Sequence, residues 1–175
     1  MDNPGLTRIV RPMKNTSDIL IAGGGLNGPA LALALAQTGH SVTVIDALPE
    51  GASEAEDFDG RGYALALASQ RLLAQTGVWE AVAAHAQPML EIKVTDGQAG
   101  QGPSPFFLHF DCAEIEESPM GYMVEDRFLR RAFNAAMAAE PKITMIRERR
   151  VVAQDIDSAG VSVTLDNGED LHGRL

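Results

Sequence analysis

Cysteine, long apolar runs and basic residues are all scarce in this sequence. Cys112 is the only cysteine among the 175 residues, which excludes both an intramolecular disulfide and a cysteine-based zinc site. The four histidines are scattered without the spacing of metal ligands, and we expect no metal centre. No apolar run approaches the roughly 18 residues that a membrane-spanning helix needs. One unpaired thiol fits a reducing, cytoplasmic setting.

Acidic residues outnumber basic ones. The 14 Lys and Arg against 24 Asp and Glu give a net charge of -10, and a surface of this sign repels the phosphate backbone of nucleic acids. We therefore expect no nucleic-acid partner. Apolar residues at 45% and charged residues at 22% are close to globular averages, which excludes wholesale disorder.

The first residues differ in character from the rest of the chain. Residues 1–17 combine basic side chains with prolines and have no apolar segment like that of a secretory signal, so we expect a flexible leader. No clean linker interrupts residues 18–175, and we expect them to form one folded unit.

Residues 18–46 have the order of a strand–helix–strand unit. Residues 18–22 are a short apolar run that ends at glycines, which is typical of a strand in a parallel sheet. Residues 26–38 are rich in alanine and leucine and predict a helix, which Gly39 ends. Residues 41–46 are rich in β-branched side chains and predict the second strand. The crossover between the two strands should be right-handed.

Further elements are expected downstream, with an antiparallel portion added to the parallel sheet. The acidic residues 48–60 are expected to form a solvated, mobile loop, and residues 97–105 a turn-rich link. Asp166, Asn167 and Gly168 predict a two-residue hairpin turn. We expect helices at 65–77 (with Leu67, Leu72 and Leu73 facing inward), 79–83 and 126–139, and strands at 89–95, 106–110, 143–146, 151–156, 161–165 and 170–175.

Three glycines between the first strand and the first helix match the spacing G-x-G-x-x-G. Gly23 can make the sharp turn out of the strand, and Gly25 has no side chain to hold a diphosphate away from the backbone. Gly28 lets the helix pack closely on the sheet. The N–H groups at the helix start, including those of Leu26 and Asn27, would then face the phosphates with help from the helix dipole.

An acidic residue follows this motif at the expected distance. Asp46 ends the second strand 18 residues after Gly28, where its carboxylate can accept hydrogen bonds from a ribose hydroxyl pair. The simpler interpretation is that the glycines only make a tight turn and Asp46 only caps a strand. The combined order of strand, glycine loop, helix, terminating glycine, strand and acid favours an α/β Rossmann-like nucleotide site. Asp46 would repel a 2′-phosphate and no Arg follows it directly, which disfavours NADP here and leaves FAD and NAD.

Two later segments resemble a known family of enzymes. Phe58 to Leu65 (FDGRGYAL) and Gly77-Val78-Trp79 are similar to the D-x-R…A-L…G-[LIV]-W pattern of ubiquinone-biosynthesis hydroxylases, of the 2-polyprenyl-6-methoxyphenol hydroxylase type. Glu91 to Asp96 and Gly121 to Glu125 resemble the same family in order and spacing. The resemblance extends from about Ile19 to Leu175.

The resemblance assigns roles to individual residues. It implies that Gly23, Gly25 and Gly28 contact the FAD diphosphate and that Asp46, where the family usually has Glu, contacts the adenosine ribose. It places Arg61 beside the FAD phosphates and ribityl chain, a location that suits a guanidinium fork. An ion pair of Arg61 with Asp57 or Asp59 is the alternative.

A third group of side chains has simpler explanations. Members of the family place an Asn, Arg or Gln near the position of Asp126, at the head of the helix beside the flavin. For Asp126 itself, capping of the helix is the simpler interpretation. Phe106, Phe107 and Phe110 could border an apolar substrate channel, but a strand that buries alternate aromatics is the simpler explanation. Residues 147–150 (RERR) are interpreted as a solvated strand entry.

The resemblance also implies an activity. NAD(P)H would reduce FAD, O₂ would add to form a flavin C4a-hydroperoxide, and oxygen would pass to the ring of a polyprenyl phenol, without a metal and with no catalytic side chain assigned in this stretch. Because this substrate is so apolar, we expect the whole enzyme to work at a membrane face without a membrane-spanning helix. The family's chains are roughly twice as long, so we expect residues 18–175 to be the N-terminal part of an FAD-binding domain, inactive by itself.

Two other classes of protein stay open at this point. One is a stand-alone nucleotide-binding module without catalysis, and the other is an NAD-dependent dehydrogenase.

Overall fold

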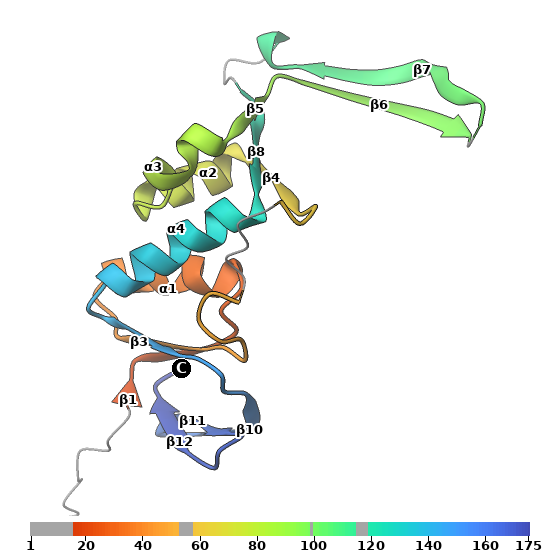
Figure 1. Ribbon diagram of the computed structural model, residues 1–175. Coiled ribbons are helices and arrows are strands. Elements are labelled where there is room, and N and C mark those ends of the chain that lie inside the picture. The colour runs from red at the N-terminus through yellow and green to blue at the C-terminus, as the bar shows by residue number, and fades with distance from the viewer. Residues whose placement is uncertain (1–15, 53–57, 99, 115–118) are drawn as a thin grey trace, which may run out of the picture.

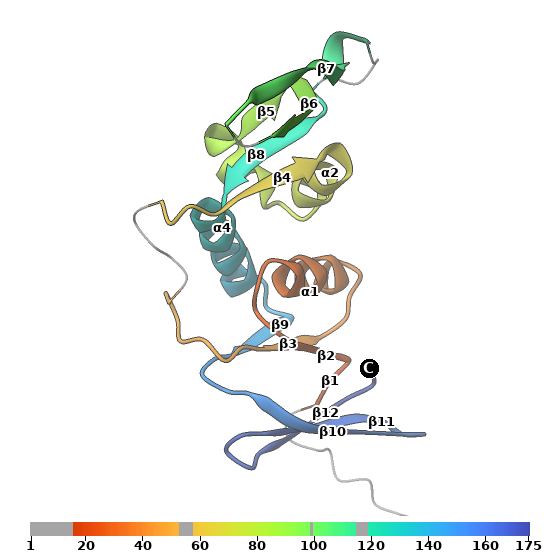
Figure 2. The ribbon, with the colours of Figure 1, turned by 90° about the vertical axis from the view of Figure 1, so that its right-hand side faces the viewer.

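The chain folds into layers around a small parallel sheet (Figure 1). The computed structural model describes residues 16–52, 58–98, 100–114 and 119–175. Figure 2 shows α1 (Asn27–Gln37) and α4 (Asp126–Ala139) on one face of that sheet and an antiparallel meander on the other. The meander consists of β10 (Val151–Asp157), β11 (Gly160–Leu165) and β12 (Asp170–Gly173).

The parallel sheet has the strand order β2–β3–β9. Its strands are β2 (Ile19–Ala22), β3 (Val42–Ile45) and β9 (Ile143–Ile146), with Val42 paired to both Ile19 and Ile143. All four residues of β3 are buried because this central strand is covered on both faces. Val42 and Val44 belong to the core under the helices, whereas Ile45 packs with the meander. The predicted strand–helix–strand unit and α/β fold are therefore confirmed.

The meander closes the other face of the sheet. β1 (Thr16–Ser17) pairs in parallel with β12, so the last two residues of the predicted leader are part of the sheet, and the rest of that leader lies outside the described residues. The Leu165 carbonyl accepts the N–H of Gly168 at 2.9 Å, and Gly168 has a φ of 81°. This is a three-residue hairpin loop with glycine in the left-handed position, and not the two-residue turn that we predicted.

A second sheet holds the segment that follows the acidic loop. β4 (Gly62–Ala66), β8 (Gly121–Glu125) and β5 (Gln87–Met89) form it in the order β4–β8–β5. Helix α2 (Leu67–Gln75) begins two residues after the predicted start because Leu65 and Ala66 pair with β8. Leu73 is buried as predicted, but Leu72 is 45% exposed and does not face inward. The short α3 (Trp79–Val82) and a 3₁₀ turn (Ala83–His85) follow.

A long hairpin projects from this second sheet (Figure 1). Its strands are β6 (Glu91–Gln98) and β7 (Gly102–Asp111), so most of the predicted link at 97–105 is strand; a short 3₁₀ turn (Cys112–Glu114) follows. The register pairs Ile92 with Phe110 and Val94 with Leu108 on one face. These side chains are 39–63% exposed. The expectation that the strand buries alternate aromatics was wrong, since Phe106 is 85% exposed and Phe107 57%.

No helix in the described part of the chain is long and apolar enough to cross a membrane. No group of three or more His, Cys, Asp or Glu side chains within the same residues is arranged to hold a metal ion.

Candidate functional site

The loop between β2 and α1 has the backbone geometry that its glycines predict. Gly23 has a φ of 115°, a conformation that favours glycine, and its N–H donates to the carbonyl of Ile45 at 2.8 Å. A methyl group at Gly28 would overlap the carbonyl oxygen of Gly23, so the helix can pack here only with glycine. At Gly25 no heavy atom lies within 4 Å of the position that a Cβ would take. The outer side of the loop is therefore open.

The first turn of α1 leaves backbone donors available. Leu26 is the N-cap residue, and its carbonyl accepts the N–H of Ala30 at 3.2 Å. No side chain of the described residues caps this end, and the first turn contains no acidic residue. The N–H groups of Asn27 and Gly28 precede the first helical hydrogen bond, so they have no acceptor within the helix. Such a helix start suits an anion such as a diphosphate.

Asp46 lies directly beside the glycine loop. It follows β3, and its N–H donates to the carbonyl of Ile146 at 2.8 Å. Its Oδ1 accepts the N–H of Leu48 at 3.2 Å, while its Oδ2 occupies the space that a side chain at Gly24 would need. The carboxylate is half-buried and stands one strand away from the open loop. The structure thus brings together the five predicted loop residues and Asp46.

Arg61 forms a different part of the surface. Its Nε and one terminal nitrogen donate to Oδ2 of Asp59 at 2.8 and 2.5 Å, and the same terminal nitrogen lies 3.2 Å from Oδ2 of Asp126. The hydrogen bond from Arg61 lowers the pKa of the Asp59 carboxyl and raises the pKa of Arg61 itself. The alternative interpretation, an ion pair with Asp59, is therefore present in this structure. Asp57 lies outside the described residues.

Asp126 is a buried counter-ion and not a helix cap. Glu125 is the N-cap residue of α4, and no side chain caps this helix in the described part of the chain. Asp126 is 1% exposed, and its Oδ2 accepts the Nε of Arg130 at 2.6 Å in addition to the contact with Arg61. Its Oδ1 is buried without a hydrogen-bond partner among the described residues. Sequence reasoning missed Arg130, although an acid and an arginine four residues apart share a helix face.

A cavity of about 410 Å³ lies between the start of α1, strand β4 and helices α2 and α4. It is lined from α1 by Leu26 and Asn27, from β4 by Tyr63, and from α4 by Arg130. Its wall is mainly apolar, and Asn27, Tyr63, Ser69 and Arg130 are the polar residues that line it. A cavity that combines apolar walls with a few polar groups is the usual form of a cofactor or ligand site.

Comparison with known proteins identifies the family. The model of the FAD binding domain family matches residues 16–173, which is nearly the whole chain. The chain belongs to this FAD-binding family, and FAD is confirmed as the predicted cofactor.

Two curated relatives support the resemblance seen in the sequence. Ubiquinone hydroxylase UbiL of Rhodospirillum rubrum is 45% identical over 159 residues, which are 91% of this chain and 36% of the relative. The 3-demethoxyubiquinol 3-hydroxylase of Escherichia coli is 34% identical over 161 residues, 91% of this chain and 40% of that protein. The chain therefore spans less than half the length of these relatives.

Solved structures share the fold. PqsL of Pseudomonas aeruginosa, described as a probable FAD-dependent monooxygenase, superposes with a TM-score of 0.71 at 23% identity and covers 92% of this chain and 41% of that one. The flavin-dependent monooxygenase PieE, solved with FAD and substrate, gives a TM-score of 0.69 at 18% identity, over 91% of this chain and 29% of that one.

The residues described above fit an FAD molecule. The open face at Gly25 leaves room for the diphosphate, and the uncapped helix start supplies donors for it. Asp46 offers carboxylate oxygens at the place where the ribose would follow. The unpaired Oδ1 of Asp126 would accept a hydroxyl hydrogen.

Proposed function

We propose that this chain is the FAD-binding part of a flavin-dependent hydroxylase that acts on a polyprenyl phenol in ubiquinone biosynthesis. The observation that carries the proposal is the open glycine loop with the carboxylate of Asp46 against it, in a chain that belongs to an FAD-binding family. The 45% and 34% identities to proteins named as ubiquinone-pathway hydroxylases support the substrate class.

Each site residue has a definite role in this proposal. The N–H groups of Leu26, Asn27 and Gly28 hold the diphosphate, and Gly23 and Gly25 keep the backbone free of side chains there. Asp46 accepts hydrogen bonds from the ribose hydroxyls. Arg61 exchanges its exposed partner Asp59 for a phosphate oxygen, because a guanidinium binds either anion through the same fork.

The chemistry comes from the cofactor. When bound, FAD would take two electrons from NAD(P)H and react with O₂ at C4a, so that one oxygen atom enters the phenol ring and the other leaves as water. The protein's part is to bind, to orient and to exclude water from the reacting ring. We assign no side chain of this chain as a catalytic acid or base.

FAD binding by the chain itself tests the proposal. Gly25→Val places a branched side chain in the space open to the diphosphate, and its Cβ meets no heavy atom within 4 Å, so the variant should fold and bind FAD at least ~10-fold more weakly, or about 1.4 kcal/mol. Ala153→Val, on an exposed strand of the meander, is the matched control and should bind like the wild type. Flavin fluorescence titration measures both. Equal affinity of the two variants would contradict the proposed site.

We also propose a cytoplasmic setting with peripheral membrane contact, because a polyprenyl phenol dissolves in the bilayer and not in water. Co-sedimentation of the chain with phosphatidylcholine vesicles loaded with ubiquinone tests this. We expect a larger bound fraction of the chain with these vesicles than with quinone-free vesicles in high salt. A supernatant that retains all the protein under both conditions would refute the contact.

A further inference from the structure

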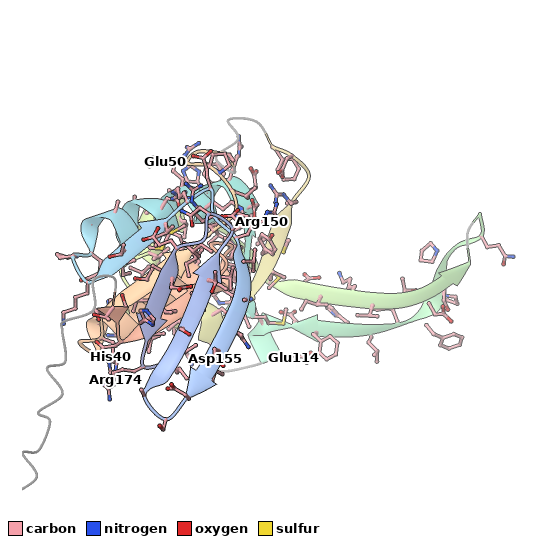
Figure 3. The ribbon with its side chains drawn as sticks, turned by 90° about the horizontal axis from the view of Figure 1, so that it is seen from below. His40, Glu50, Glu114, Arg150, Asp155 and Arg174 are labelled. Carbon is pink, nitrogen blue, oxygen red and sulfur yellow. The ribbon has the colours of Figure 1, made fainter. Side chains whose placement is uncertain are left out.

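A turn rich in arginine lies beside Asp46. The turn comprises residues 147–150 and follows β9, the third strand of the parallel sheet. The N–H of Arg149 donates to the carbonyl of Asp46 at 3.1 Å, and the N–H of Glu148 reaches the carbonyl of Leu48 at 3.4 Å. The segment interpreted from sequence as a solvated strand entry is therefore joined to the nucleotide side of the sheet. In Figure 3, Glu50 and Arg150 lie in the upper part of the view and Arg174 lies at the lower left, beside His40.

The backbone of this turn is unusual. Glu148 has a φ of 57° and is the one residue other than glycine with a left-handed backbone in the described part of the chain. That conformation is uncommon for a residue with a side chain and persists where the surroundings hold it. Here the two hydrogen bonds to the carbonyls of Asp46 and Leu48 hold it, and they join the backbone of Arg149 to that of Asp46.

The order of strands along the sheet edge matches the order of groups in an adenosine diphosphate. The loop after β2 offers the diphosphate site and Asp46 after β3 offers the ribose site, so the end of β9 is next in line. Adjacent strands lie about 4.8 Å apart, which is close to the step from phosphate to ribose and from ribose to base. The group that meets the turn after β9 is therefore the base.

The three arginines of the turn are not equivalent. Arg147 donates to Oδ1 of Asn134 on α4 at 3.1 Å, which directs it to the helix side of the sheet. The carbonyl of Arg150 accepts the N–H of Asp166 at 2.9 Å, so that residue already runs with the meander. Arg149 lies between them and is half-buried, with one terminal nitrogen on the carbonyl of Glu148 at 2.6 Å. The planar guanidinium is held by this local bond, and a purine can stack on such a plane.

We propose that Arg149 is a base-binding residue of this site, whose guanidinium stacks on the adenine of the bound dinucleotide. The inference rests on the proposed function, because it requires the diphosphate at the glycine loop. In this arrangement the turn after β9 supplies a cationic side chain beside the base. Ala47 and Leu48, which directly follow Asp46, supply no cationic side chain.

Titration calorimetry with FAD, ADP and inorganic pyrophosphate tests the inference on the chain as it stands. Arg149→Ala should weaken FAD and ADP by about fivefold, as expected for a cation over an aromatic face, and leave pyrophosphate unchanged. Arg149→Lys should show the same loss, since it keeps the charge but not the plane. Arg174→Ala is the matched control: the Arg174 side chain is 79% exposed and pairs with Asp18, which precedes β2 and so lies at the opposite end of the parallel strands from the turn after β9.

The outcomes separate this inference from the proposed function. If both Arg149 variants bind ADP like the wild type while Gly25→Val loses it, the base contact is wrong and the FAD site stands. If Arg149→Ala weakens pyrophosphate as much as ADP, or if Arg174→Ala has the same effect, the contribution is general charge and the base contact is again wrong. A wild-type chain that binds neither FAD nor ADP would overturn both.

Discussion

The contact between Gly28 and Gly23 yields a sharp prediction about stability. A methyl group at Gly28 would overlap the Gly23 carbonyl oxygen, which is backbone and cannot move without opening the loop. Overpacking of this kind costs about 1–3 kcal/mol. For a chain of this size each kcal/mol lowers Tm by about 2–4 °C, so Gly28→Ala should lower Tm by ~2–12 °C.

Gly25→Ala is the matched substitution three residues earlier in the same loop. Gly25 is outside the left-handed region and a Cβ there meets no atom, so alanine should leave Tm unchanged or raise it slightly through a smaller unfolded-state entropy. Thermal unfolding followed by circular dichroism measures both variants. The same Tm for Gly28→Ala and Gly25→Ala would refute the close approach of helix and strand.

Two further predictions concern the charges around α4. Because the side-chain hydrogen bond from Arg61 is the main cause that lowers the pKa of Asp59, this pair should stabilise the fold above the usual Asp pKa and lose that contribution as pH falls through the lowered one. Carboxyl NMR titration should show a higher Asp59 pKa in Arg61→Ala than in the wild type, although the backbone N–H of residue 61 still donates to Asp59 in the variant. Asp126→Ala leaves the partly buried Arg130 without its carboxylate and should destabilise the fold by about 3–5 kcal/mol in urea unfolding, whereas a loss below ~1 kcal/mol would show that the buried pair is unimportant.

The first half of the site could be predicted from sequence because its signals are local. The apolar strand, the spaced glycines, the glycine that ends the helix and the acid at the next strand end all occur within residues 18–46. Each is needed by the backbone at its own position, as the φ of Gly23 and the contact at Gly28 show. The placement of Asp46 follows from parallel pairing of the two strands.

The remaining features depend on partners that are distant in sequence. Leu65 and Ala66 are strand and not helix because they pair with Tyr122 and Gly121, which no local pattern around them indicates. That pairing also brings Arg61 to Asp126, whose N–H donates to the Arg61 carbonyl at 3.0 Å. The arginine turn reaches Asp46 only because β9 pairs with β3.

The projecting hairpin shows another limit of sequence patterns. The strand expected at 106–110 is confirmed, and its pairing with β6 places Leu108 and Phe110 on one face together with Ile92 and Val94. The pattern does not reveal whether anything covers the face, since burial is a property of the whole arrangement. In this structure Lys93 and His109 contact Glu91 on the polar face, at 2.6 and 3.2 Å, while the apolar face is exposed.

A crystal structure of the chain soaked with ADP tests the central claim most directly. We predict the diphosphate within hydrogen-bond distance of the N–H groups of Asn27 and Gly28, and a ribose hydroxyl within the same distance of the Asp46 carboxylate. ADP bound elsewhere, or a ribose that leaves Asp46 without contact, would contradict the assignment of this loop as the nucleotide site.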